Sequence, residues 1–172
     1  MSIGYIYMNK TKKLVTLSVA VSLTIVLSYV DKIVTSLAPL PPGIKLGLAN
    51  IAVVFALYKL GTREGAIISI VRVILSSILF GTAVSFWYAI AGATVSLVLM
   101  ILLKKLTPLS CVTVSTVGGI SHNVAQICVA SILFDTNLLV YYLPFLLIAG
   151  VVSGIVIGTA SAILVKRIKL KS

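Results

Sequence analysis

The chain has 172 residues, of which 60% are hydrophobic and 10% charged, and its formal net charge is +11. So few charges cannot cover the surface of a soluble domain of this length, and a mean hydropathy of +1.22 is typical of a membrane protein. The basic residues stand in short clusters between apolar runs, as in the loops of membrane proteins. The composition therefore excludes a soluble domain, favours membrane lipid as a partner and disfavours nucleic acid.

Six apolar segments predict an all-α integral membrane protein. The first segment follows a lysine cluster at residues 10–13, as in a signal peptide, but no small-x-small cleavage site comes after it. We therefore interpret it as a retained membrane helix that ends at Asp31 and Lys32. A proline-rich link at residues 38–43 cannot form regular helix. The expected helices cover residues 14–30, 44–60, 64–80, 85–103, 109–134 and 138–165.

The loop charges predict the orientation of these helices. With the N-terminus in the cytoplasm, eleven of the fourteen basic residues fall inside and two, Lys32 and Lys45, fall outside. The remaining one, Arg72, lies within an expected helix. This asymmetry requires an even number of spans. The eleven inner residues are Lys10, Lys12, Lys13, Lys59, Arg63, Lys104, Lys105, Lys166, Arg167, Lys169 and Lys171.

We accordingly expect one domain over residues 1–172, a six-transmembrane-helix bundle of the bacterial plasma membrane. Both ends of the chain would lie in the cytoplasm. Residues 1–13 would form a cytoplasmic N-terminal segment, and residues 166–172 would form a basic cytoplasmic tail.

Arg72 lies in the middle of an apolar stretch, residues 65–80. An arginine at the centre of a bilayer costs roughly 3 kcal/mol on insertion scales. The three acidic residues all fall near the expected helix ends, so we expect no acid to neutralise Arg72 at its depth. An anionic ligand, or a set of helix carbonyl and amide oxygens, would then bind the guanidinium. A small-molecule site inside the membrane is the leading hypothesis.

Two other segments offer polar groups to such a site. His122 and Gln126 are spaced i, i+4 and share a helix face, and Asn123, the residue after His122, lies next to this face. The irregular segment before the second expected helix offers a cation at Lys45 and an amide at Asn50 near the external face. The alternatives are hydrogen bonding between helices for the first group and a snorkelling lysine with a packing asparagine for the second.

These residues predict a binding site that runs from mid-membrane to the external face. The set contains no carboxylate, which argues against a proton or metal-ion relay and against the paired acidic clusters that hold magnesium in diphosphate enzymes. We therefore expect binding without catalytic residues, metal or cofactor in this chain. The predicted substrate-binding residues are Lys45, Asn50, Arg72, His122, Asn123 and Gln126.

Two stripes of small residues predict close helix packing. Ser18 and Ser22 form a small-xxx-small pattern in the first expected helix. Gly150, Gly154 and Gly158 form a longer stripe in the last one, which we expect to pack within the bundle.

Three of these segments also resemble a known family. Residues 42–50 (PGIKLGLAN), Arg72 and residues 121–126 (SHNVAQ) are similar to the Gx transporter family, which is also named heptaprenyl diphosphate synthase component I. The similarity covers nearly the whole chain. The group is similar to the substrate-binding S components of energy-coupling-factor transporters. The resemblance implies a six-helix binding protein that docks on a transmembrane coupling subunit driven by two ATPase subunits.

In S components an Ala-xxx-Ala motif on the first helix contacts the coupling subunit, and Ser18 and Ser22 occupy that spacing here. The two family names imply different functions. The transporter name implies uptake of a small anionic or polar molecule, for which an isoprenoid or quinone precursor is one candidate. The synthase name implies a non-catalytic accessory role in menaquinone side-chain synthesis. We favour the transporter subunit, and a structural membrane scaffold is a third alternative.

Overall fold

The structure is a computed structural model that describes residues 9–37, 47–135 and 138–168. Within these ranges all regular elements are helices, which confirms the all-α prediction. They are α1 (Lys10–Leu37), α2 (Asn50–Lys59), α3 (Thr62–Phe80), α4 (Ala83–Leu106), α5 (Cys111–Leu133), the 3₁₀ helix η1 (Leu138–Tyr142) and α6 (Leu143–Arg167).

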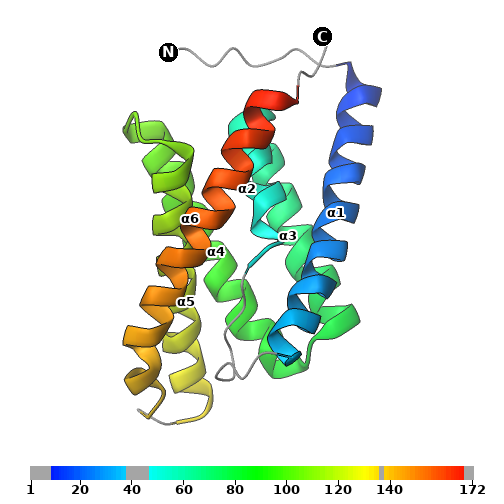
Figure 1. The fold of residues 1–172 in the computed structure, drawn as a ribbon. Coiled ribbons are helices and arrows are strands. Elements are labelled where there is room, and N and C mark those ends of the chain that lie inside the picture. The colour runs from blue at the N-terminus through cyan, green and yellow to red at the C-terminus, as the bar shows by residue number, and fades with distance from the viewer. Residues whose placement is uncertain (1–8, 38–46, 136–137, 169–172) are drawn as a thin grey trace.

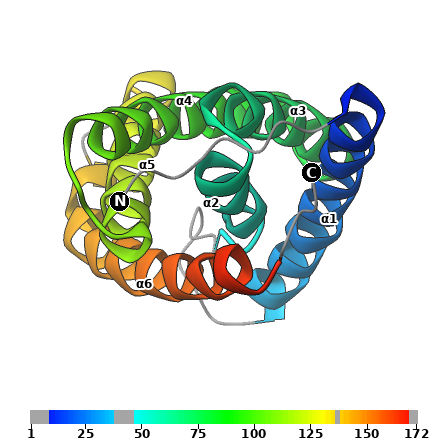
Figure 2. The ribbon, with the colours of Figure 1, turned by 90° about the horizontal axis from the view of Figure 1, so that it is seen from above.

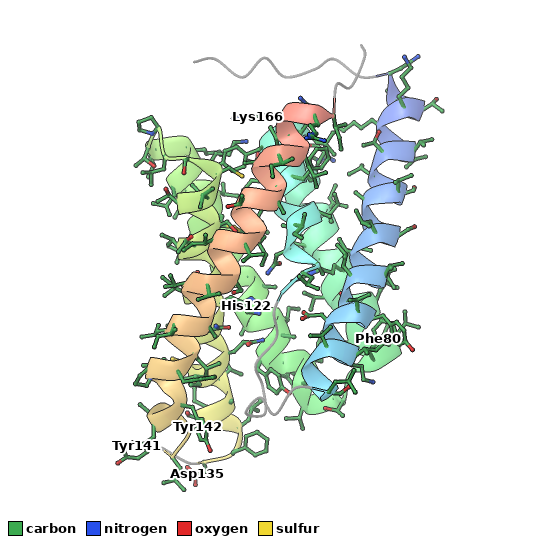
Figure 3. All side chains as sticks on the ribbon, in the orientation of Figure 1. Phe80, His122, Asp135, Tyr141, Tyr142 and Lys166 are labelled. Carbon is green, nitrogen blue, oxygen red and sulfur yellow. The ribbon has the colours of Figure 1, made fainter. Side chains whose placement is uncertain are left out.

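Five long helices form a ring around the short α2. Viewed along the bundle, α1, α3, α4, α5 and α6 surround α2, which occupies the centre (Figure 2). The start of α1 and the end of α6 lie at the same end of the bundle (Figure 1). Lys166 marks this end, and Asp135, Tyr141 and Tyr142 mark the opposite one (Figure 3). We call these the Lys166 end and the Asp135 end.

The central position of α2 follows from its sequence, because every side chain from Ala52 to Leu57 is apolar and buried. Its 10 residues span only about 15 Å, half the thickness of a bilayer core. The predicted start of this helix at residue 44 was therefore wrong. Gly47, with a φ of 71°, adopts a conformation that a helix cannot continue through.

The glycine stripe of α6 packs against α5, as expected. A Cβ atom on Gly154 would lie 2.5 Å from the Thr116 Cα, and one on Gly158 would lie 2.6 Å from the Val112 Cα. Gly150 faces Gly119 in the same way. The two backbones approach so closely that no larger side chain fits between them.

The outer surface of the ring is apolar. Four helical segments are long and apolar enough to cross a membrane: Lys10–Val34, Ala83–Leu106, Cys111–Leu133 and Val140–Arg167. Each of them exposes large aliphatic side chains. The remaining long helix, α3, has 19 residues but carries Arg63, Glu64 and Arg72. These features indicate a membrane protein.

Candidate ligand-binding cavity

One cavity of about 450 Å³ lies inside the ring, and residues from all six α-helices line it. Cavities of this size hold small organic ligands. Asn50, the first residue of α2, is among the lining residues, so the positive end of that helix's dipole faces the cavity. The fold therefore places a half-length helix end at an internal space, which is a known arrangement for binding anionic groups in membrane proteins.

Arg72 of α3 lines this cavity and is only 8% exposed. Its buried Nε atom has no hydrogen-bond partner among the residues that the structure describes. A guanidinium normally hydrogen-bonds through most of its five N–H groups when it is buried. Arg72 thus carries at least one buried N–H group that no described residue bonds, in the wall of the cavity.

Asp31 of α1 also lines the cavity, and this corrects the expectation that no acid lies near Arg72. The prediction ended the first helix at residue 30, but α1 continues to Leu37, so Asp31 stands inside a helix and not at its end. It is 6% exposed and interacts favourably with the charge of Arg72. Arg72 is therefore partly compensated within the protein.

Asp31 has a second contact, with the turn that leads into α2. Its Oδ2 atom accepts a hydrogen bond from the backbone N–H of Gly47 at 2.9 Å. The backbone N–H of Asn50 in turn donates to the Gly47 carbonyl at 2.8 Å. Asp31 therefore fixes the start of α2 relative to α1.

His122 and Gln126 lie on the cavity-lining face of α5, as their spacing predicts. Both pack against Gly92 of α4. A Cβ atom on Gly92 would lie 2.8 Å from the Gln126 Cγ and 3.0 Å from the His122 ring. A glycine at position 92 thus gives these two side chains their space, a role that the sequence analysis missed.

Asn123 and Asn50 also line the cavity. The Asn123 amide donates to the Leu146 carbonyl of α6 at 2.8 Å, so this side chain has the interhelical role that was its alternative interpretation. The structure thus brings five of the six predicted site residues to one cavity. The sixth, Lys45, lies outside the described residues.

Hydroxyl groups make up much of the remaining lining, and the sequence analysis did not identify them. Ser85 and Thr82 form a reciprocal capping box at the start of α4, and Ser76 bonds the Val73 carbonyl at 3.3 Å. Isolated serines in apolar helices carry no distinctive spacing, so only the fold could assign them to a cavity. The lining hydroxyl residues are Ser28, Ser36, Ser76, Ser77, Thr82, Ser85, Tyr88, Ser96, Ser115 and Ser153.

The described side chains do not form a group of three histidines, cysteines or carboxylates that could hold a metal ion. The lining instead combines the buried Arg72, Lys32, one aspartate, an imidazole, amides and hydroxyls. Such a set can bind and orient a polar or anionic molecule through hydrogen bonds.

Comparison with known proteins identifies the family of the chain. No curated protein and no solved structure matches the chain. The family model described as heptaprenyl diphosphate synthase component I matches residues 20–164, which include all the described cavity-lining residues of the six helices. The chain therefore belongs to the heptaprenyl diphosphate synthase component I family.

Proposed function

We propose that this protein is a membrane substrate-binding subunit that resembles the S components of energy-coupling-factor transporters and takes up a small anionic or polar molecule. The observation that carries this proposal is the internal cavity with the buried Arg72 in its wall, since no described residue bonds the Arg72 Nε. Arg72, His122, Gln126, Asn50 and Asn123 would contact the ligand. Lys45 remains a candidate from the sequence.

The same proposal includes the topology. Six helical crossings, with α2 as the helical part of the second, would place both ends of the chain in the cytoplasm of a bacterial plasma membrane. The charge distribution supports this, because the described basic residues other than Lys32 and Arg72 stand at the starts of α1 and α3 and at the ends of α2, α4 and α6. These helix ends lie at the Lys166 end of the bundle (Figure 1). The lining residues Ser36 and Thr82, near the end of α1 and the start of α4, would then lie towards the external side.

Docking on a coupling subunit is proposed for α1. Ser18 and Ser22 are both exposed on this helix, beside the exposed Val15 and Val19. The Ser22 hydroxyl donates to the Ser18 carbonyl at 3.0 Å, so this hydroxyl needs no further hydrogen-bond acceptor from a partner. The two small side chains leave the helix surface shallow here. A partner helix could approach such a surface closely.

The second candidate function rests on the family description itself. A heptaprenyl diphosphate synthase component without catalytic groups would assist a separate catalytic chain in making an isoprenoid tail. The described cavity has one acidic residue, Asp31, and so lacks the paired carboxylates that hold magnesium for diphosphate chemistry. Accordingly we expect any catalysis on another polypeptide.

Affinity purification of the tagged full-length protein from its native membrane distinguishes these functions. The transporter proposal predicts co-purification of a membrane coupling subunit with ATPase subunits, together with a small molecule retained in the cavity. A soluble prenyl synthase chain in their place would support the accessory role. Neither type of partner would leave the structural scaffold as the remaining alternative.

A further inference from the structure

The inner part of the cavity contains two buried hydroxyl groups that the proposed anion site does not use. Ser96 of α4 and Ser115 of α5 both line the cavity, and each is 4% exposed. Neither hydroxyl hydrogen-bonds to another residue that the structure describes. By contrast, the hydroxyl of Ser153, in the same cavity, donates to the Gly150 carbonyl at 3.3 Å.

The two hydroxyls come from neighbouring helices that meet at Gly118 of α5. The Ser96 Oγ would stand 3.2 Å from a Cβ atom on Gly118. Ser115 precedes Gly118 by three residues on α5 and therefore shares its helix face. The Met100 side chain fills the position beside Gly118, since its Sδ would lie 2.7 Å from a Cβ atom there, and Met100 lines the cavity together with Ser96 and Ser115.

The two serines lie nearer the Lys166 end of the bundle than His122 and Gly92 do. Ser115 precedes His122 by seven residues, about 10 Å along α5 towards the Lys166 end. Ser96 follows Gly92, which contacts His122, by four residues, about 6 Å along α4. Val54, Met100 and Ile157 line the cavity at this depth and belong to one buried apolar cluster.

We propose that Ser96 and Ser115 form an inner subsite that binds a hydroxyl or carbonyl group of the ligand, so that the ligand is a two-ended molecule such as a hydroxy or oxo acid. The inference rests on the proposed function, since it takes the Arg72 region as the site of the acidic group. The second polar group would then lie roughly 6–10 Å from the level of His122, measured along α4 and α5.

The two hydroxyls favour a polar group of the ligand because a polar group that is buried without a hydrogen-bond partner costs free energy. A purely hydrocarbon tail in the inner space would displace water from both hydroxyls and give them nothing to bond. A site built to hydrogen-bond a ligand discriminates strongly against an analogue that lacks the bonding group. The inner subsite therefore disfavours a simple alkyl or prenyl chain.

The test compares matched probes on the full-length protein in detergent. The probes are straight-chain alkanoates from butanoate to octanoate and the corresponding ω-hydroxy acids, and their affinities are measured by isothermal titration calorimetry. We expect at least one ω-hydroxy acid to bind about fivefold to tenfold more tightly than its alkanoate, the gain from one or two neutral hydrogen bonds. The double variant Ser96→Ala/Ser115→Ala should remove this preference, whereas Ser153→Ala should retain it.

The outcomes separate this inference from the proposed function. If alkanoates and hydroxy acids bind equally well, and Arg72→Met abolishes both, the anion site stands and the inner subsite is wrong. If no probe binds, or binding does not depend on Arg72, both proposals fail. The comparison of probes on the unaltered protein needs no variant, so it decides the question even if the double variant does not fold.

Discussion

The Asp31 carboxylate accepts a hydrogen bond from the Gly47 backbone N–H at 2.9 Å, and this bond joins α1 to the turn that starts α2. The same carboxylate interacts favourably with the charge of Arg72. Asp31 therefore joins α1 to the start of α2 at the cavity wall and offsets part of the charge that an anionic ligand would meet.

Substitution of Asp31 separates these two roles. Asp31→Asn keeps an oxygen that can accept the Gly47 N–H, whereas Asp31→Ala leaves this N–H without its partner. We expect Asp31→Ala to lower the free energy of unfolding by about 1–3 kcal/mol and Asp31→Asn by less. Thermal unfolding in detergent measures the difference, and equal melting temperatures for the two variants would contradict the role of the bond.

Loss of the charge should also change ligand affinity. In Asp31→Asn a ligand's anionic group would no longer compete with the carboxylate for Arg72. We expect anionic probes to bind this variant more tightly than the unaltered protein, by calorimetry. Weaker anion binding by Asp31→Asn would show that the carboxylate assists the ligand and does not oppose it.

The contact of α5 with α6 should tolerate no added methyl group. In Gly154→Ala the new Cβ would lie 2.5 Å from the Thr116 Cα, a backbone atom that cannot move alone. In the matched variant Gly118→Ala it would lie 2.7 Å from the Met100 sulfur, which a flexible side chain can move. We expect Gly154→Ala to lose about 1–3 kcal/mol of stability and Gly118→Ala clearly less. Comparable melting temperatures would contradict the packing.

Cysteine labelling in intact cells tests the topology. Tyr141 is 83% exposed at the Asp135 end, and Thr107 follows α4 at the Lys166 end. In a background without Cys111 and Cys128, Tyr141→Cys should react with an impermeant reagent added outside, and Thr107→Cys should react only after the membrane is opened. Equal labelling of the two positions before opening would rule out the proposed orientation.

The proposed docking surface on α1 has its own test. Ser18→Leu/Ser22→Leu should block close approach of a coupling subunit without unfolding the protein, because leucine suits a lipid-facing position. Thr159→Leu, at an exposed position on α6, is the matched control. The double variant should lose the co-purifying subunit and the control should keep it. Full recovery of the subunit with the double variant would remove the assignment.

Several site residues could be predicted from the sequence because each is anomalous where it stands. Arg72 interrupts an apolar run, and the i, i+4 spacing of His122 and Gln126 places both on one face of α5. Such signals depend only on local sequence and helix periodicity. They were sufficient to identify five of the residues that line the cavity.

Asp31 and the serines could not be found in this way. The position of Asp31 depended on where α1 ends, and apolar periodicity placed that end seven residues too early. The serines become lining residues only because α2 is short and leaves space beneath its first turn. Both features depend on tertiary packing, which local sequence patterns do not record.

Ligand binding by Arg72→Met tests most directly whether Arg72 binds the ligand. Methionine removes the charge but fills similar space, so the fold should persist. Because Asp31 compensates part of the charge, we expect little change in melting temperature and not the large gain that removal of a wholly uncompensated cation would give.

The measurement is mass spectrometry of small molecules released from equal amounts of the purified proteins, with Ser76→Ala as the control for a polar change in the same cavity. If Arg72 binds the ligand, the unaltered protein and Ser76→Ala should release the same polar or anionic molecule. Folded Arg72→Met should release none. A folded Arg72→Met that retains this molecule, or an Arg72→Met that unfolds, would contradict a ligand-binding role for Arg72 and indicate a structural one.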